Sequence, residues 1–442
     1  MKNNKKIIIG SGLSGPLLAI LLSNRGYDVD LYEKRSDQRV KTNNSDRSIN
    51  LALSHRGIQA LKSANIFDQV DPLLIPMKGR MVHLINGEVE FQPYSVNSCD
   101  YINSISRRSL NNILIDNAEQ SHNVKIYFNH SLSQIDKLRN QLIFSNEKKI
   151  LMSNHIFGAD GTGSIIRKYI DSNTNTPSRS DPLGHNYKEL NIAASKNGDF
   201  QLEPNALHIW PREGFMLIAL PNMDKSFTCT LFLNKKGKVS FEALKDSNLV
   251  VDFFNKYFSD VLPLLDNFPQ NFFANPNGKL GTIYSDNWQY NNQFCLIGDA
   301  AHAIVPFFGQ GMNASFEDCE ILMKVIDENQ GNWNKVFQKY NQIRKPDGDA
   351  IAQMAIENYL EMRDLVIKKN FLQEKEISNI LWENFPNRFI PRYNMVSFTS
   401  IPYSEIYKRG KIQKEILEKI NIHNPDYKLA EKLINKKLAP IK

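Results

Sequence analysis

The first residues of the chain alternate between strand-forming and helix-forming segments around a run of glycines. The β-branched run Ile7–Ile9 ends in the sequence Gly-Ser-Gly-Leu-Ser-Gly of residues 10–15, and apolar residues then follow at helical spacing. The chain turns at residues 25–26 and resumes as a strand over 28–32 that ends at Glu33. This order of strand, glycine turn, helix and strand is typical of the βαβ unit that opens a doubly wound α/β sheet.

The spacing of the glycines indicates a dinucleotide site rather than an ordinary tight turn. Gly10 permits the turn after the strand, Gly12 lets a pyrophosphate approach the backbone, and Gly15 allows helix and strand to pack closely. The N-terminus of the helix offers free N–H groups and the positive end of its dipole to phosphate. Glu33, eighteen positions after the last glycine, can accept a hydrogen bond from a ribose hydroxyl.

Two later segments repeat the pattern of strand, glycine turn and helix. Residues 156–167 contain the turn Asp160-Gly161, and residues 294–302 place Asp299 at the carboxyl end of a strand. Asp299 can hold a ribityl hydroxyl, and the helix that begins at Gly311 can direct N–H groups at a flavin. Each segment alone also fits a plain strand-to-helix turn. Three of them in order have no obvious structural reason except a long, folded cofactor such as FAD.

Composition limits the remaining function classes. The chain has 442 residues, 41% hydrophobic and 23% charged, which predicts a folded protein of two or three units. A net charge of +7 suits anionic ligands, but no Lys/Arg stripe with interleaved aromatics indicates nucleic acid. Four cysteines without metal-binding or disulfide spacing predict no metal site and a cytoplasmic location. No apolar run approaches the roughly 20 residues of a membrane span.

The three turns together resemble the fingerprints of the single-component flavoprotein aromatic hydroxylases. Within that group, longer stretches are similar to the members that hydroxylate L-kynurenine, over roughly residues 5–400. The stretches that carry this similarity are residues 47–54, 75–80, 205–211, 215–222, 227–232, 303–313 and 357–363. Two small departures are Asp46, where Gly or Ala is more usual, and the pair Ala314-Ser315.

The resemblance implies an α/β fold with a Rossmann-like FAD-binding domain, an inserted antiparallel substrate-binding sheet and a C-terminal helical region. The FAD domain is expected over residues 1–70, 100–180 and 277–325, and the substrate domain over 71–99 and 181–276. Residues 326–442 are expected to be mainly helical.

The resemblance also implies the reaction. FAD is expected to be held tightly without a covalent bond, NADPH to reduce it, and O2 to form a flavin hydroperoxide that hydroxylates L-kynurenine at its 3-position. The amine of the substrate activates its own ring, so no catalytic side chain is expected. His302 beside Asp299 could serve as a base, but a histidine satisfied within its turn is the preferred interpretation.

The resemblance assigns a set of residues to each ligand. Besides the glycines, the expected FAD contacts are Leu13, Glu33, Lys34, Arg35, Ala52, Arg107, Leu132, Asp160, Asp299, Gly311, Met312 and Asn313. The expected substrate contacts are Arg80, Tyr94, Phe307, Asn358, Glu361, Met362 and Tyr393. Arg80 can fork onto a carboxylate and Tyr94 can donate to it. A surface role for Arg80 and core roles for Tyr94 and Tyr393 are the alternatives.

The hairpin that carries Arg80 and Tyr94 presents a difficulty. A two-residue turn at Asn86-Gly87 would place Val82, Leu84, Val89 and Phe91 on one face, which is the register that the apolar pattern favours. That register puts Arg80 and Tyr94 on opposite faces, so a bulge near Pro93 would be needed to join them.

Alternative functions stay open from the residues alone. A flavin-dependent halogenase or reductase would share the fold, but its W-x-W-x-I-P motif is missing. A hydroxylase of another aromatic acid and a flavin-binding sensor without turnover are the other two. The lysine-rich segment 408–437, with an apolar stripe at Ile412, Ile416 and Ile420, predicts a packed surface helix, with membrane attachment as the alternative. The oligomeric state cannot be read from the sequence.

Overall fold

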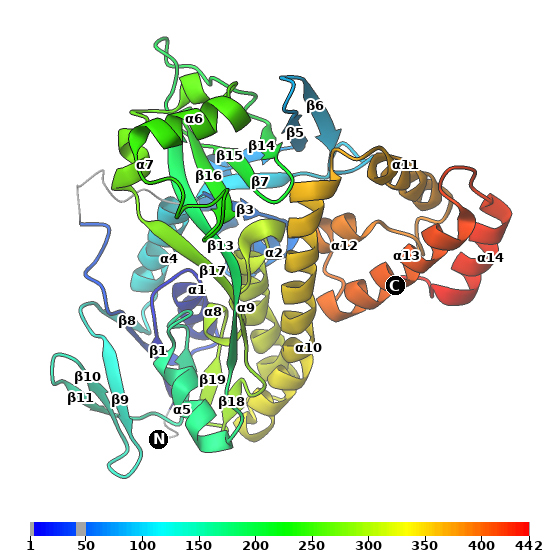
Figure 1. The fold of residues 1–442 in the computed structure, drawn as a ribbon. Helices are drawn as coiled ribbons and strands as arrows, with labels where there is room; N and C mark the ends of the chain where they lie inside the picture. The colour runs from blue at the N-terminus through cyan, green and yellow to red at the C-terminus, as the bar shows by residue number, and fades with distance from the viewer. Residues whose placement is uncertain (1–3, 41–49, 442) are drawn as a thin grey trace. The chain divides into compact units, whose positions relative to one another are not determined.

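The computed structural model describes residues 4–40 and 50–441, so Asp46 and Arg47 lie outside the described residues. The chain divides into two compact units, each discontinuous in sequence (Figure 1). Unit 1 consists of Met1–Leu74, Ile105–Asp181 and Gly281–Ala352, and unit 2 of Ile75–Ser104, Pro182–Leu280 and Gln353–Lys442. By compactness, residues 326–352 group with unit 1 and the later helices with unit 2. The expected three-part division by function stays a prediction.

Unit 1 is built on a mainly parallel sheet. The strand order is β18 (Gln289–Tyr290), β19 (Phe294–Leu296), β12 (His155–Gly158), β1 (Lys5–Ile9), β2 (Asp28–Tyr32) and β8 (Val124–Tyr127). All neighbouring strands are parallel except the edge pair β18 and β19. The β-branched residues Ile7 and Ile8 are fully buried at its centre, as expected for a strand covered on both faces. The three predicted glycine turns follow β1, β12 and β19, which are neighbours in this sheet.

Helices and a small antiparallel sheet complete unit 1. Helix α1 follows the first glycine turn and contacts both α4 and α9. The small sheet consists of β9 (Leu132–Asp136), β10 (Gln141–Phe144) and β11 (Lys149–Leu151). The remaining elements are α1 (Ser14–Ser23), β3 (Asn50–Leu53), α2 (His55–Ser63), α3 (Phe67–Val70), η1 (Asp71–Leu73), α4 (Arg107–Gln120), α5 (Ile165–Thr174), α8 (Asp299–His302), η3 (Pro306–Phe308), α9 (Gly311–Glu328) and α10 (Trp333–Leu360), whose last turns belong to unit 2.

Unit 2 contains the expected antiparallel sheet. Its strand order is β17 (Asn277–Tyr284), β13 (Arg179–Ile192), β16 (Phe227–Asn234), β15 (Met216–Pro221), β14 (Ala206–Pro211), β5 (Gly79–His83) and β6 (Val89–Pro93). Only β14 and β5 pair in parallel. Outside this sheet, β4 (Ile75–Met77) pairs with β7 (Ile102–Ser106). The helices α6 (Ser247–Tyr257), η2 (Leu262–Leu264) and α7 (Gln270–Ala274) follow β16 in the chain. The mixed α/β fold expected from the sequence is confirmed.

The register of the β5–β6 hairpin differs from the prediction. His83 pairs with Val89, and the N–H of Leu84 donates to the carbonyl of Glu88 over 2.8 Å, so the loop has three residues, 85–87, and not two. Gly87 adopts a φ of +90°, the left-handed conformation that closes a three-residue hairpin loop. The predicted shared apolar face is therefore wrong, because Val89 is 45% exposed and Phe91 is 51% exposed.

This shift of one residue removes the difficulty with Arg80 and Tyr94. Arg80 pairs directly with Gln92, and Tyr94 follows two residues later, so Arg80 and Tyr94 lie on the same face. The N–H of Tyr94 donates to the carbonyl of Lys78 over 3.1 Å, which continues the same register beyond the strand. No bulge near Pro93 is needed.

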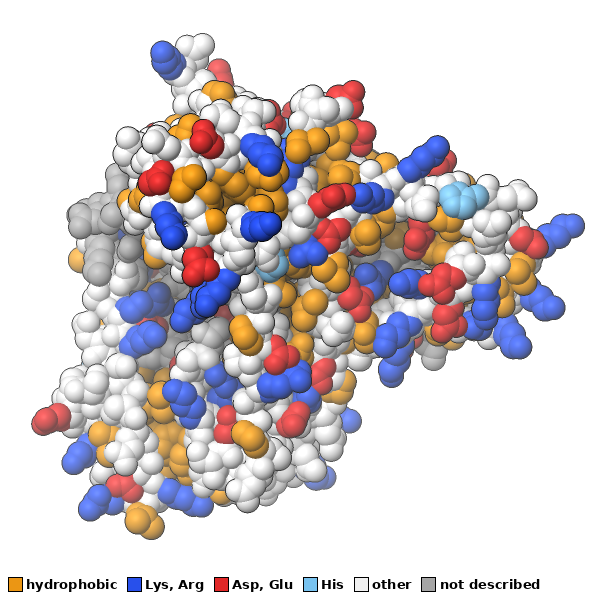
Figure 2. Space-filling view, viewed as in Figure 1, with side chains coloured by type: hydrophobic (Ala, Val, Ile, Leu, Met, Phe, Trp, Pro, Cys, Tyr) orange, Lys and Arg blue, Asp and Glu red, His pale blue; other side chains and the backbone are white. Residues whose placement is uncertain are grey.

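The C-terminal part of unit 2 is helical. After α10 the chain forms a π-helix, η4 (Glu361–Leu365), and then α11 (Lys369–Asn384), α12 (Arg392–Phe398), α13 (Tyr403–Ile420) and α14 (Tyr427–Lys437). Ile416 and Ile420 of α13 are buried against α11 and α14, so the apolar stripe is used in packing. Figure 2 shows Lys and Arg interspersed with Asp and Glu over the surface of these helices. In residues 4–40 and 50–441, no helix is long and apolar enough to cross a bilayer.

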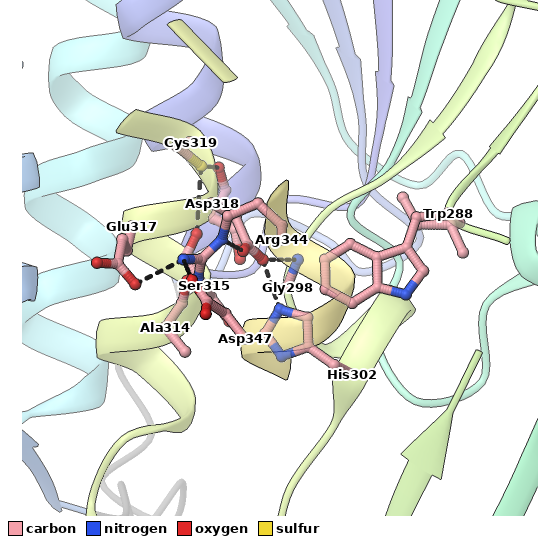
Figure 3. Close-up of polar contacts among 12 residues, drawn as sticks. Trp288, Gly298, His302, Ala314, Ser315, Glu317, Asp318, Cys319, Arg344 and Asp347 are labelled. Atoms are coloured by element: carbon pink, nitrogen blue, oxygen red, sulfur yellow. Dashed lines mark hydrogen bonds and ion pairs between the residues drawn. The ribbon is translucent and has the colours of Figure 1, made fainter. Parts of the chain in front are cut away.

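A cluster of buried charges holds the third glycine turn of unit 1 (Figure 3). The carboxylate of Asp318 on α9 accepts hydrogen bonds from the Gly298 N–H (3.0 Å), from Nε of Arg344 (2.8 Å) and pairs with Nε2 of His302 (2.6 Å). The ring of Trp288 stacks on His302 with centroids 4.9 Å apart. Asp318 therefore connects the end of β19, the short helix α8 and the long helix α10.

Arg344 extends this cluster to two further carboxylates. Its Nη1 contacts Glu317 (2.8 Å) and Asp347 (3.1 Å), and Glu317 also pairs with Arg56 of α2. Burial by itself would raise the pKa of Asp318, but the charges of His302 and Arg344 outweigh it and hold that pKa below its usual value. His302 is thus satisfied within its turn, in agreement with the preferred interpretation from the sequence.

Replacing Asp318 with Asn is expected to lower the free energy of unfolding by about 3 kcal/mol, because Arg344 and His302 would each lose a buried charged partner. Urea denaturation followed by circular dichroism measures this difference. The control is Glu328→Gln at the exposed end of the same helix, which should leave the midpoint unchanged. An unchanged midpoint in Asp318→Asn would show that the cluster contributes no stability.

The same pair of proteins tests the sign of the pKa shift. A carboxylate with a lowered folded pKa stabilises the protein above its unfolded pKa, and this contribution is lost as the pH falls further. The parent and Asp318→Asn should therefore differ most near neutral pH and converge below about pH 4. A difference that grows in acid would contradict the shift.

Candidate active site

The first glycine turn of unit 1 needs two of its glycines for purely steric reasons. Gly10 has a φ of +105°, and an added Cβ there would lie 2.3 Å from the carbonyl oxygen of Ala159. A Cβ on Gly15 would lie 2.0 Å from the carbonyl oxygen of Gly10. The turn can therefore form only with a bare backbone at both positions, which brings helix α1 close to strand β1.

Other glycines of these turns have no such reason. An added Cβ on Gly12 or on Gly163 meets no atom within 4 Å, and neither residue has a positive φ. Neither the backbone nor the packing of the protein explains their lack of a side chain. A phosphate-bearing ligand that approaches the backbone does explain it, so the two turns fit a cofactor of the FAD type.

Glu33 at the end of β2 is buried beside the first turn. Its Oε2 accepts from the N–H of Ser11 (2.7 Å), and its Oε1 accepts from the N–H and Nε of Arg35 (2.9 Å each). Burial by itself would raise the pKa of Glu33, but these hydrogen bonds hold it below its usual value. The carboxylate is thus ionised at neutral pH and fixed at the edge of the glycine turn, where it can accept a further hydrogen bond.

The second and third turns are connected by one arginine. Nη1 of Arg167 on α5 donates to the carbonyl of Ala300 (2.7 Å), and Nη2 donates to the carbonyl of Thr162 (2.5 Å). Asp160 accepts from the N–H of Ile165 over 2.7 Å and so fixes the start of α5. These contacts set the spacing between the two turns.

At the third turn the polar groups divide between ligand-accessible and structural positions. Asp299 is exposed, and the charge of Arg107 at the start of α4 acts on it. The amide of Asn313 is fully buried: its Oδ1 accepts from the Ser54 N–H (2.9 Å), and its Nδ2 donates to the carbonyls of Ala52 and Gly309 (2.8 Å each). Asn313 therefore holds the turn around Gly309 against β3.

The remaining expected FAD residues also lie in unit 1. Lys34 is exposed next to Glu33, and Leu132 and Met312 are buried at the starts of β9 and α9. Leu13 is the N-cap residue of α1, and Gly311 is the first residue of α9. The expected cofactor set thus belongs to one compact unit.

Unit 2 brings the expected polar substrate residues together. The rings of Tyr94 and Tyr393 stack with centroids 4.9 Å apart and an interplanar angle of 14°. The guanidinium carbon of Arg80 lies 5.6 Å from the centroid of Tyr94 and 5.2 Å from that of Tyr393. We call these three residues the Arg80–tyrosine cluster. Burial raises the pKa of both tyrosines, so their hydroxyl groups keep their protons at neutral pH.

The guanidinium of Arg80 is buried but weakly paired. Its Nη1 lies 3.5 Å from the carboxylate of Glu361, which is long for an ion pair of this kind. Its Nε makes no hydrogen bond within residues 4–40 and 50–441. A buried guanidinium with an unused donor is costly unless an anion completes it, so the cluster fits a ligand carboxylate. The surface role considered for Arg80 is wrong, because the residue is only 6% exposed.

The chain brings three further expected residues to the end of α10. Asn358 is 2% exposed and its Nδ2 lies 3.3 Å from the sulfur of Met362, one turn later. Glu361 and Met362 stand in the π-helix η4, whose wide turn interrupts the regular hydrogen bonding. π-helical turns of this kind occur often at functional sites. Phe307 is buried in η3 and belongs to unit 1, apart from the other six substrate candidates.

Some residues around the cluster were missed by sequence reasoning. Nε2 of Gln92 donates to the carbonyl of Val366 (3.0 Å), and Nδ2 of Asn394 donates to the carbonyl of Tyr94 (3.2 Å). Nζ of Lys375 donates to the carbonyl of Pro93 (3.0 Å). All three bind main-chain atoms far away in sequence, so no local motif marks them.

Comparisons with known proteins agree with these sites. The family model described as "FAD binding domain" matches residues 4–355. A kynurenine 3-monooxygenase from Cytophaga hutchinsonii is 43% identical over 98% of this chain and 98% of its own length. One from Myxococcus xanthus is 40% identical over 98% of this chain and 95% of its own.

A solved structure agrees in fold. The crystal structure of P. aeruginosa PqsL in complex with 2-aminobenzoylacetate has a TM-score of 0.64 at 18% identity, covering 82% of this chain and 97% of that one. At this identity the likeness shows the fold alone. The curated relatives are much closer and extend over almost the whole chain, and the FAD-binding family model spans most of it. The chain therefore belongs to the kynurenine 3-monooxygenase family of FAD-binding proteins.

Proposed function

We propose that this protein hydroxylates L-kynurenine to 3-hydroxy-L-kynurenine. The observation that carries the proposal is the buried Arg80–tyrosine cluster, which offers an unsatisfied guanidinium to a carboxylate in a chain whose relatives are kynurenine 3-monooxygenases. L-Kynurenine has one carboxylate, one α-ammonium group and an aromatic ring activated by an ortho amine. The overall change consumes O2, NADPH and a proton and yields the hydroxylated product, NADP⁺ and water.

Bound FAD supplies the redox chemistry of this reaction, and the protein supplies binding and orientation. Gly12 and Gly163 leave the backbone open to the pyrophosphate side. Glu33 accepts from a ribose hydroxyl, with Lys34 and Arg35 on the adenosine half, and Asp299 accepts from the ribityl chain with Arg107 close by. Leu13, Ala52, Leu132, Asp160, Gly311, Met312 and Asn313 complete the set, the last through the turn that its amide holds.

At the substrate end, Arg80 binds the carboxylate through Nε and one Nη, a geometry that only a planar guanidinium provides. The hydroxyl groups of Tyr94 and Tyr393 donate to the same carboxylate. Glu361 leaves its long contact with Arg80 and accepts from the α-ammonium group. Asn358 and Met362 contact the amino-acid chain, and Phe307 of unit 1 contacts the aromatic ring.

No side chain is proposed to act as a catalytic acid, base or nucleophile. The ring amine of the substrate supplies the electron density that hydroxylation requires, and the buried tyrosines keep their protons. The cytoplasmic location expected from the cysteine usage stays a prediction.

The direct test is NADPH oxidation by the FAD-loaded protein with and without L-kynurenine, with the product identified by mass spectrometry. We expect a yellow protein, an oxidation rate that rises with L-kynurenine, and a product one oxygen atom heavier. Rapid oxidation with a phenol or salicylate instead would assign the chain to another aromatic acid. A protein that takes up no FAD would contradict the whole proposal.

Glu33→Ala is expected to weaken FAD binding by about 1–3 kcal/mol, because a buried ribose hydroxyl and the Ser11 N–H would both lose their acceptor. Fluorescence titration of the apoprotein with FAD measures the change. Asp28→Asn, at the exposed start of the same strand, is the matched control and should bind as the parent does. If Glu33→Ala binds FAD as tightly as the parent, the residue is only a strand-end charge.

Arg80→Ala is expected to keep its FAD and to raise the KM for L-kynurenine, with a loss of about 2–5 kcal/mol in kcat/KM, because a buried carboxylate loses its partner. Arg80→Lys should recover only part, since a point charge cannot form the fork. Steady-state kinetics with FAD occupancy measured in parallel provide the data. Lys78→Ala removes an exposed charge two residues away and serves as the control. An unchanged KM in Arg80→Ala would place the carboxylate elsewhere.

A further inference from the structure

Lys375 of α11 stands beside the Arg80–tyrosine cluster without belonging to any assigned site. We propose that Lys375 is a second cationic specificity determinant, which fixes the end of the β5–β6 hairpin and attracts the carboxylate of the substrate together with Arg80. This inference rests on the proposed function and adds a residue to the same site.

The first support is mechanical. Nζ of Lys375 donates to the carbonyl of Pro93 over 3.0 Å. Pro93 pairs with Gly79 across the hairpin. Pro93 and Gly79 are the residues directly before Tyr94 and Arg80, so a single ammonium group holds the strand ends from which both ligand-binding side chains project. A shift of this hairpin end would move both groups at once.

The second support is the local balance of charge. Two charged groups act on Lys375: Arg80 of β5, which repels it, and Glu361 of η4, which attracts it. Burial, assisted by Arg80, lowers the pKa of Lys375 to about 8. Two cations thus share one carboxylate, and that carboxylate makes only a long contact with Arg80. An excess positive charge in a half-buried place is unfavourable unless an anion balances it.

A zwitterionic amino acid supplies the missing complement. Its carboxylate balances Arg80 and Lys375, and its α-ammonium group takes over Glu361. A ligand without a carboxylate leaves the two cations uncompensated. Lys375 should therefore raise the preference of the site for carboxylate-bearing substrates, which is a statement about specificity and not only about stability.

The test compares L-kynurenine with kynuramine, which keeps the aromatic ketone and the amine but lacks the carboxylate. Lys375→Met keeps most of the apolar stem and removes the charge. With FAD-loaded protein, the ratio of kcat/KM for L-kynurenine over kynuramine should fall about five- to tenfold, the factors that correspond to about 1–1.4 kcal/mol. Lys369→Met, an exposed lysine at the start of the same helix, is the matched control.

The pH dependence separates a charge effect from a packing effect. A lysine with a folded pKa of about 8 is charged below that pH, so the preference of the parent for the carboxylate should decline above it. Lys375→Arg retains its charge and should extend the preference to higher pH. The α-amino group of the substrate titrates in all variants alike, so the difference between variants is the measured quantity.

The outcomes are distinct. If the parent neither binds nor hydroxylates L-kynurenine, the proposed function fails and this inference fails with it. If the parent is active and Lys375→Met keeps both FAD and the full preference for L-kynurenine, only the role of Lys375 is overturned. If the variant loses activity on both ligands equally and Lys375→Arg shows no rescue at any pH, the residue is structural and the proposal is again wrong.

Discussion

The burial of charged side chains is the constraint on which both units of this protein depend. A buried charge must find partners, because an isolated one costs more than the fold can supply. In unit 1 this need is met internally: Asp318 receives Gly298, His302 and Arg344, and the third glycine turn is fixed as a result. In unit 2 it is met only partly, since Arg80 keeps an unused Nε and a long contact to Glu361. The complete cluster is structural, and the incomplete one is where a ligand fits.

Much of the fold could be predicted from the sequence because its signals are local. The glycine turns after β1, β12 and β19 reveal themselves by strand, turn and helix patterns within a few residues, and the steric requirement at Gly10 and Gly15 is visible in their spacing. The apolar stripe of α13 likewise predicted a packed helix. Strand alternation predicted an antiparallel sheet in the second unit, although not the parallel pair of β14 and β5.

The rest depends on contacts that no local pattern reports. Whether Arg80 and Tyr94 share a face is decided by one residue of register, and the apolar pattern of the hairpin favoured the wrong one. The pattern misled because Val89 and Phe91 are exposed on an edge strand, so burial does not specify the register there. Arg344 and Lys375 join segments far apart in the chain, and only the folded structure shows what each of them holds.

The three-residue loop at 85–87 gives the hairpin an all-or-none character. Because side chains alternate with a period of two, removing one residue from this exposed loop would move the whole of β6 by one step against β5 and carry Tyr94 to the face opposite Arg80. No residue of the ligand-binding cluster would have changed. In this protein, loop length alone can therefore act on substrate binding as a substitution in the site would, and natural variation in the length of this loop would redraw specificity without leaving a trace in the binding residues themselves.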